Sequence, residues 1–271
     1  IEKVARGQLW LTKRKQMTQF SANLGFLWTE LSLPNAIRAA HLAGFEAVEC
    51  HWPYDTNSEF VNDVLHETGL RMLGLNTTRG NHLKGDNGLS ALPDQKPQAR
   101  AAIDQAVAYA VAVKCSKIHV MAGIASGNEA HETFIENLSY ACDEAEKHDL
   151  AVLIEPLNEY DAPGYFLQST DQALKIIQEI DQSNLKLMFD CYHVQLLEGD
   201  LTQKLTRLMP HIGHIQFAGV PSRGRPDIGE VDYGHIFRHL SSLGYTAPLG
   251  AEYKVAGSTE ETLGWMKTLR T

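Results

Sequence analysis

The sequence predicts an α/β protein folded as a single (β/α)8 TIM barrel. Eight short apolar stretches alternate with eight amphipathic stretches, and no Gly/Ser-rich or Pro-rich linker divides the chain. A doubly wound open sheet is the competing fold, but it needs fewer strands and usually carries a GxGxxG turn after its first strand. Residues 23–34, NLGFLWTELSLP, contain no such turn, so the sequence favours the barrel.

The predicted strands are short and rich in Val, Ile, Leu or Phe, a composition typical of parallel strands that are buried on both faces. A closed barrel needs a sizeable core, and a chain of 271 residues with 44% hydrophobic residues can supply it. The strands are expected at residues 20–24, 45–50, 71–76, 117–121, 151–155, 186–190, 214–217 and 249–252.

Capping residues and glycines mark the ends of the predicted helices. STDQ (169–172), DLTQ (200–203) and STEE (258–261) each place an oxygen-bearing side chain three residues before Gln or Glu, which is the pattern of a capping box. Glycine readily takes the left-handed conformation that ends a helix. It stands where the first, second and seventh helices should end, at Gly44, Gly69 and Gly244.

Composition narrows the class of function. The formal net charge of −9 weakly disfavours a nucleic-acid ligand or an anionic membrane surface, because both are bound through basic surfaces. No stretch approaches the ~20 apolar residues of a membrane-spanning helix. The four cysteines are scattered and form no CxxC pair, which favours reduced thiols and a cytoplasmic location.

The first 16 residues, IEKVARGQLWLTKRKQ, are basic and lack the apolar run of about 7–15 residues that a secretion signal needs. Met17 then opens a stretch typical of the start of a domain. We therefore interpret residues 1–16 as an N-terminal extension and residues 17–271 as a single catalytic barrel domain. A functional N-terminal arm is the alternative.

Polar residues end four consecutive predicted strands. Glu155, Asp190, Gln216 and Glu252 follow or close the apolar runs, and active sites of this fold gather at the carboxyl ends of the strands. Converging buried carboxylates repel one another unless a cation binds them. Oxygen donors suit Mg²⁺ or Mn²⁺ better than Zn²⁺. Alone, each Glu is as consistent with a cap or an ion pair, and Gln216 with substrate binding only.

Several motifs, taken in order, resemble the hydroxypyruvate isomerase family, within the xylose isomerase-like sugar isomerases and epimerases. The resemblance covers residues 17–271, and its most specific segments are GRPDIGE and AEYK. The matching stretches are FSANLGFLWTE (20–30), GLSALP (88–93), HVMAG (119–123), IEPLN (154–158), FDCYHVQ (189–195), HIQFAGVPSRGRPDIGEVDY (214–233) and AEYK (251–254).

The resemblance implies a divalent metal held by Glu155, Asp190, Gln216 and Glu252. It also implies that Glu155 and Glu252 act as acid and base, in an order that the sequence leaves open, and that His193 and Arg223 lie beside the substrate. The implied reaction converts hydroxypyruvate to tartronate semialdehyde (2-hydroxy-3-oxopropanoate) through a cis-enediolate. A homologous 2-oxo-tetronate is the alternative substrate.

A few positions qualify this interpretation. Related epimerases usually carry His where Gln216 stands, which favours the narrower family. Arg225 and the loop TTRGNH (77–82) depart from the family pattern.

The substrate carboxylate requires a cation, and Lys254 and Arg223 are the candidates. Alternation along the last strand points Lys254 to the same side as Glu252. We treat three other histidines as structural or surface residues: His51, His82 and His119. Phe26, Trp28, Trp52 and Tyr54 either wall the pocket or pack.

Three further functions stay open. One is a ketose 3-epimerase that acts on uncharged sugars, and another is a nuclease of the abasic-site type, which needs a His-rich metal cluster and a basic face. The third is a non-catalytic binder of sugar acids. The expected partner is a small 2-oxo acid, with no nucleic acid and no membrane, and a homo-oligomer stays open.

Overall fold

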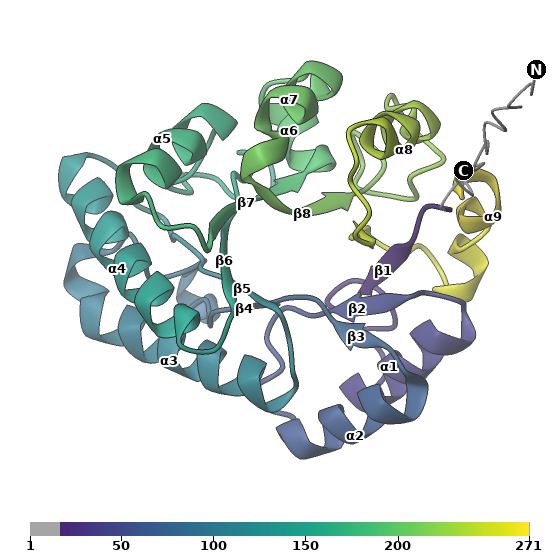
Figure 1. Cartoon of the computed structure of the whole chain (residues 1–271), viewed down its shortest axis with the longest axis horizontal. Helices are drawn as coiled ribbons and strands as arrows, with labels where there is room; N and C mark the ends of the chain where they lie inside the picture. The colour runs from purple at the N-terminus through teal and green to yellow at the C-terminus, as the bar shows by residue number, and fades with distance from the viewer. Residues whose placement is uncertain (1–16, 271) are drawn as a thin grey trace, which may run out of the picture.

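A computed structural model of the chain describes residues 17–270. Parallel strands form a closed ring with helices around its outside (Figure 1). The order along the sheet is β3-β2-β1-β9-β8-β7-β6-β5-β4, so the two outer members of the sheet are consecutive in the chain. The predicted barrel is thereby confirmed. The proposed extension at residues 1–16 lies outside the described residues. The strands are β1 (Phe20–Asn23), β2 (Ala47–Glu49), β3 (Arg71–Met72), β4 (Leu75–Asn76), β5 (Lys117–His119), β6 (Ala151–Ile154), β7 (Leu185–Asp190), β8 (Ile212–Phe217) and β9 (Leu249–Ala251).

The third predicted strand, 71–76, is bent and appears as two short strands. Its first half, β3, pairs with β2, and its second half, β4, pairs with β5. Backbone hydrogen bonds continue across the bend, since Cys50 N donates to Gly74 O at 3.1 Å and Asn76 N to His51 O at 2.8 Å. One strand position therefore closes the ring, and the barrel has eight strand positions although nine short strands are counted.

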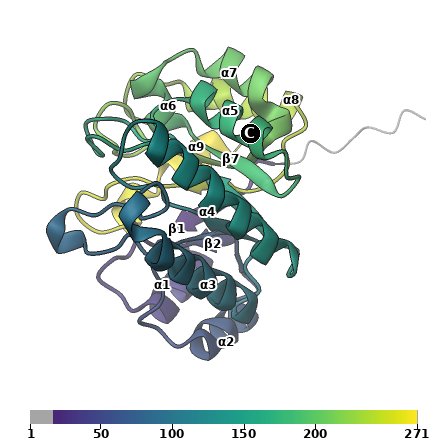
Figure 2. The same cartoon turned by 90° about the vertical axis from the view of Figure 1, so that its left-hand side faces the viewer.

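The helices cover the outer face of the ring, and α3 and α4 lie side by side in both views (Figures 1 and 2). The predicted glycine ends are confirmed by positive φ values of 86° at Gly44, 69° at Gly69 and 83° at Gly244. No helix within residues 17–270 has the length and apolar character that a bilayer crossing requires. The helices are α1 (Leu33–Leu42), α2 (Ser58–Thr68), α3 (Lys96–Ala112), α4 (Asn128–Glu146), α5 (Thr170–Ile180), α6 (Cys191–Leu197), α7 (Leu201–Leu208), α8 (Tyr233–Ser242) and α9 (Trp265–Leu269).

The three predicted capping boxes have different outcomes. Ser169 caps α5 by accepting a hydrogen bond from Gln172 N at 3.1 Å, as expected. Asp200 precedes α7 but takes a left-handed conformation, and its side chain makes no capping hydrogen bond. STEE leads to the short 3₁₀ turn Glu260–Thr262, where Glu261 Oε2 accepts a hydrogen bond from Ser258 N at 3.5 Å and the Thr259 hydroxyl accepts one from Trp28 N.

A cluster of aromatic side chains packs α9 against the strands. Trp265 is fully buried, and its ring centroid lies 4.9 Å from that of Phe20 and 5.4 Å from that of Phe217. Its indole nitrogen also donates a hydrogen bond to Tyr253 Oη at 3.2 Å. The last helix thereby anchors the chain end to β1 and β8, next to the point where β9 completes the ring.

Replacing Trp265 with Ala should lower the free energy of unfolding by about 3–5 kcal/mol, because the substitution leaves a cavity in this aromatic cluster. Urea denaturation followed by circular dichroism measures the change. The matched control is Phe60→Ala, since that ring is 63% exposed and its loss should alter stability by no more than about 0.5 kcal/mol. Equal losses in both variants would contradict the role of the cluster.

Candidate active site

The four predicted metal ligands meet at the carboxyl end of the barrel. Glu155 directly follows β6, Asp190 closes β7, Gln216 lies in β8, and Glu252 directly follows β9. These strands are neighbours in the sheet, so their carboxyl ends share one rim. All four side chains are buried, with at most 5% of any residue exposed. The structure thus brings together the four residues that the sequence singled out.

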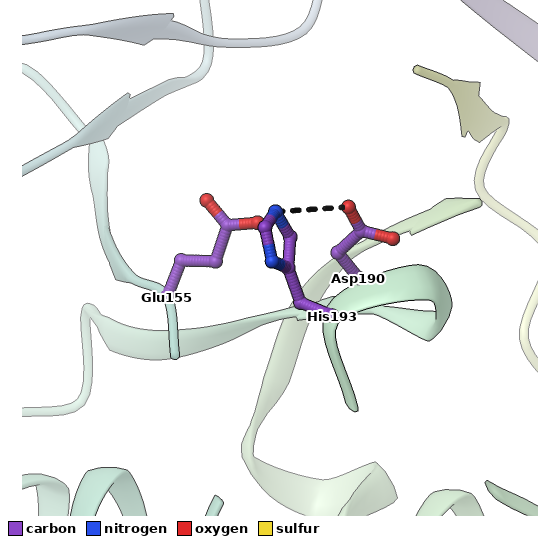
Figure 3. Close-up of side chains that lie close together, drawn as sticks. All are labelled: Glu155, Asp190 and His193. Carbon is purple, nitrogen blue, oxygen red and sulfur yellow. Dashed lines mark ion pairs between the residues drawn. The ribbon is translucent and has the colours of Figure 1, made fainter. Parts of the chain in front are cut away.

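Three oxygen atoms of this group are buried and have no hydrogen-bond partner: Glu155 Oε1, Asp190 Oδ2 and Gln216 Oε1. A buried acceptor without a partner costs free energy, so three in one place indicate a missing cation or ligand. Glu155, Asp190 and His193 also offer ligand atoms within 4.8 Å of one another (Figure 3). The residues present therefore fit a small divalent cation, which prefers oxygen donors.

Asp190 has two tasks. Its Oδ1 accepts a hydrogen bond from Tyr192 N at 2.8 Å and so caps α6, while its Oδ2 stays free for the site. The capping bond fixes the carboxylate plane. The free oxygen is therefore held in place before any cation binds.

Burial and mutual repulsion perturb the carboxyl groups. Burial raises the pKa of Glu155 well above its usual range, and the charges of Glu252 and Asp190 add to this effect. Burial likewise raises the pKa of Asp190 to about 7. Burial alone would raise the pKa of Glu252 too, but nearby His51 and the guanidinium of Arg223 hold it below its usual range. The pKa values of Glu155 and Glu252 are thus shifted in opposite directions, as is often seen in acid–base pairs.

His193 is a hydrogen-bond donor toward the site. Its Nδ1 accepts from Asn158 N at 3.0 Å, and a backbone N–H can only donate. Burial lowers the pKa of His193 to about 3, so the neutral ring carries its proton on Nε2. That nitrogen lies 3.8 Å from Asp190 Oδ2 (Figure 3). A protonated nitrogen has no lone pair for a metal, which favours substrate binding over ligation.

Arg223 brings the positive charge into the site. Its guanidinium is hydrogen-bonded to Glu252 Oε1 and lies 3.8 Å from Asp190 Oδ2. The Phe26 ring centroid lies 4.6 Å from the guanidinium carbon. Lys254, in contrast, has a side chain 60% exposed, and its Nζ lies 3.6 Å from Asp161 Oδ1. Lys254 is therefore at the rim and does not line the pocket.

A pocket lies next to these side chains, and several of the residues that line it were not predicted as site residues from the sequence. His51 and His119, expected to be structural or surface residues, are a correction to the sequence-based prediction. Both line the pocket: His119 Nδ1 lies 3.8 Å from Glu155 Oε2, and His51 Nε2 lies 3.8 Å from Glu252 Oε1. His119 closes β5, so the strand-end rule would have found it. The lining residues are Phe26, His51, Trp52, Asn76, Asn87, His119, Met121, Glu155, Leu157, Asp161, Ala162, His193, Arg223 and Glu252.

The remaining candidates, the aromatic residues and His82, divide into residues that line the pocket and residues that do not. Of the two roles left open for the aromatic residues, Phe26 and Trp52 take the first and wall the pocket. Trp28 instead lies in the core and donates its indole N–H to Glu260 Oε1 at 2.6 Å. Tyr54 donates its hydroxyl to the backbone oxygen of Asn76 and does not line the pocket. His82 is an exposed residue of a surface turn.

The low pKa of His193 predicts that its ring stays neutral, with the proton on Nε2, throughout pH 5–8. Lowering the pH in that range does not charge the ring, because its pKa of about 3 lies below it. Nitrogen-15 NMR of histidine-labelled protein measures the tautomer, and the His193→Gln variant assigns the signals. A ring that titrates near pH 6.5 would contradict the assignment.

The comparisons with known proteins agree with this geometry. The family model described as xylose isomerase-like TIM barrel matches residues 37–269. The 2-oxo-tetronate isomerase of Cupriavidus necator is 40% identical, with 93% of this chain and 98% of that protein covered. The hydroxypyruvate isomerase of Escherichia coli is 36% identical, with 94% of this chain and 100% of that protein covered.

A solved structure is also similar over nearly the whole chain. The crystal structure described as an AP endonuclease, family 2, from Brucella melitensis superposes with a TM-score of 0.90 at 35% identity, covering 94% of this chain and 100% of that one. The matches to named isomerases, the family model and the barrel agree with one another. The chain is an isomerase that belongs to the xylose isomerase-like TIM barrel family, in the group of the hydroxypyruvate and 2-oxo-tetronate isomerases.

Proposed function

We propose that this chain interconverts hydroxypyruvate and tartronate semialdehyde with the help of Mg²⁺ or Mn²⁺. The observation that carries the proposal is the set of three unpartnered buried oxygens on Glu155, Asp190 and Gln216. Their strands, β6, β7 and β8, follow one another in the sheet, and β8 adjoins β9, which leads into Glu252, whose carboxylate pairs with Arg223. This donor set is suited to a hard cation, and the adjacent pocket holds groups suited to a small acid.

Glu155, Asp190, Gln216 and Glu252 would hold the cation, which supplies Lewis-acid stabilisation of the negative charge on an enediolate. The metal hypothesis also accounts for the burial of three carboxylates. Burying charges of one sign without compensation is costly, and Arg223 offsets only part of the charge.

The proton transfers fall to Glu155 and Glu252. One carboxylate takes a proton from C3 of hydroxypyruvate, and the electron pair forms the C2–C3 double bond of the enediolate. The other carboxyl group delivers a proton to C2, while the hydroxyl proton passes from the C3 oxygen to the C2 oxygen. The carbonyl thereby moves from C2 to C3 with no change in composition. The two residues stand on β6 and β9, with β7 and β8 between them, so they flank the pocket.

The remaining polar groups serve to bind the substrate. His193 presents an N–H to the pocket and donates to a substrate oxygen. Arg223 is the buried cation of the pocket lining and receives the substrate carboxylate, with Lys254 at the rim as a weaker, exposed contributor. Phe26 and Trp52 limit the width of the pocket and exclude water from the enediolate.

A 2-oxo-tetronate is the second substrate to consider, because it presents the same carboxylate, ketone and neighbouring carbon with one more hydroxymethyl group. The name of the C. necator relative supports it. The volume of the pocket, about 170 Å³, is that of a site for a small acid. A ketose 3-epimerase is less favoured, because an uncharged sugar has no carboxylate for Arg223 to bind.

The name of the Brucella structure raises a nuclease as a rival. The charge of −9 provides no general attraction for DNA. Within residues 17–270, one cluster holds three side chains that could ligate a metal: Glu155, Asp190 and His193. It contains one histidine, whereas a nuclease of this type needs a His-rich cluster. Incubation with abasic DNA tests the rival directly.

The central experiment is an assay of hydroxypyruvate, 2-oxo-tetronates and free ketoses with Mg²⁺ and with Mn²⁺. Turnover is expected with the 2-oxo acids, and Glu155→Gln should lower kcat by about 10²–10⁴-fold, because the amide cannot exchange a proton. Glu129→Gln, an exposed change on α4, is the matched control and should retain full activity. Full turnover by the Glu155→Gln variant, or turnover of ketoses alone, would refute the proposal.

Metal binding should release protons and tighten as the pH rises. A pKa of about 7 keeps Asp190 partly protonated near neutral pH, the pKa of Glu155 is raised as well, and a cation binds the charged forms of both groups. Mn²⁺ affinity is therefore expected to be at least about tenfold higher at pH 8 than at pH 6. Isothermal calorimetry in buffers of different ionisation enthalpy measures affinity and released protons. Equal affinity at both pH values, without proton release, would contradict the prediction.

A further inference from the structure

A fourth buried acid, Glu49, lies among the interior side chains of the barrel and is not one of the four proposed ligands. It closes β2 and is 4% exposed. Its Oε1 accepts a hydrogen bond from Ser21 Oγ at 3.1 Å. Its Oε2 faces His214 Nε2 at 2.8 Å and Gln216 Nε2 at 3.1 Å. Glu49 therefore links β1 and β2 to β8.

The amide of Gln216 is held between two carboxylates. Its Nε2 donates to Glu49 Oε2 and to Glu252 Oε2, which accounts for both amide hydrogens. Turning the amide over would place its carbonyl oxygen against two carboxylate oxygens. The two acids therefore fix the orientation of the amide, and Oε1 is left as the buried, unpartnered end.

Gly250 makes room for this arrangement. A Cβ added at Gly250 would lie 2.2 Å from Glu49 Oε1, 2.8 Å from Gln216 Cγ and 3.0 Å from His214 Nε2. The backbone there does not take the left-handed conformation that demands glycine. Space for the three side chains, and not backbone geometry, is thus what a glycine provides at this point of β9.

We propose that Glu49 is a positioning residue, which orients the Gln216 amide so that its carbonyl oxygen is presented to the cation. The inference rests on the proposed function, because it assigns a purpose to Gln216 Oε1 as a ligand. Glu49 touches neither substrate nor cation in this scheme. It acts through one hydrogen bond, and Glu252 supplies the second.

The test compares the loss of Glu49 in two backgrounds. Glu49→Met keeps similar bulk but removes the acceptor, and should weaken Mn²⁺ binding about tenfold or more in the otherwise unchanged protein. A carboxylate at position 216 has two equivalent oxygens and no orientation to fix. In the Gln216→Glu background, Glu49→Met should therefore leave Mn²⁺ affinity undiminished. Electron paramagnetic resonance of free Mn²⁺ measures binding, and circular dichroism checks the fold.

A second variant disturbs the network without removing any of its polar groups. Gly250→Ala should also weaken Mn²⁺ binding about tenfold, because the new methyl group would displace the Glu49 carboxylate. Gly74→Ala is the matched control, since a Cβ at Gly74 would meet no atom within 4 Å. That variant should bind Mn²⁺ within about twofold of the unchanged protein. The methyl group would also press on Gln216 Cγ, so the decisive result is the opposite one: normal Mn²⁺ affinity in a folded Gly250→Ala protein would overturn the proposal even if Glu49→Met does not fold.

The outcomes separate the two proposals. Equal loss of Mn²⁺ affinity in both Glu49→Met backgrounds, or normal affinity in a folded Gly250→Ala protein, would overturn the role of Glu49 and leave the proposed function intact. An unchanged protein that binds no Mn²⁺ would overturn the cation site, and the positioning role with it. Background-dependent loss together with a weakened Gly250→Ala protein would support the inference.

Discussion

Repulsion between buried carboxylates is the constraint on which this site depends. Glu49, Glu155, Asp190 and Glu252 are each no more than 5% exposed, and they occupy one end of the barrel interior. Buried negative charges that lie close together destabilise a fold unless other groups offset them. The polar hydrogens of Ser21, Asn23, His214 and Gln216 offset part of the charge, and so does Arg223. The oxygens without a partner, on Glu155, Asp190 and Gln216, mark the place where a bound cation would offset the remaining charge.

The positive charge of Arg223 offsets several of these carboxylates at once. It pairs with Glu252 and lies near Asp190 and Asp161, packed against Phe26. A divalent cation would take over the neutralisation of Glu252 and Asp190. The guanidinium would then have hydrogen-bonding capacity for an anionic substrate. Cation and anionic substrate would therefore complement each other electrostatically at the proposed site.

The sequence predicted the barrel well, because strand composition and strand–helix alternation report directly on a closed parallel sheet. Eight strand positions were placed within a few residues, and the main surprise was the bend that splits residues 71–76. The convergence of Glu155, Asp190, Gln216 and Glu252 on one rim could also be predicted, because polar residues at the ends of buried runs are conspicuous. Asp200 shows the limit of local rules, because its backbone conformation prevents the cap that its sequence suggests.

The missed residues share a physical reason. His51 and His119 act in the pocket through contacts with Glu252 and Glu155, which are about 200 and 36 positions away in the chain. Glu49 likewise depends on partners from β8, which no local pattern reveals. Lys254 shows a limit of strand alternation: the strand ends at Ala251, so alternation no longer dictates where a side chain three residues later points, and this side chain is exposed at the rim.

The double duty of Asp190 links two parts of the site. One oxygen caps α6, and His193 stands in the first turn of that short helix. The negative charge of Asp190 also favours the helix start, where the backbone N–H groups converge. Neutralising this one side chain would consequently loosen the His193 imidazole that lines the pocket. One carboxylate, Asp190, thus contributes both to the proposed cation site and to the ordering of the His193 ring.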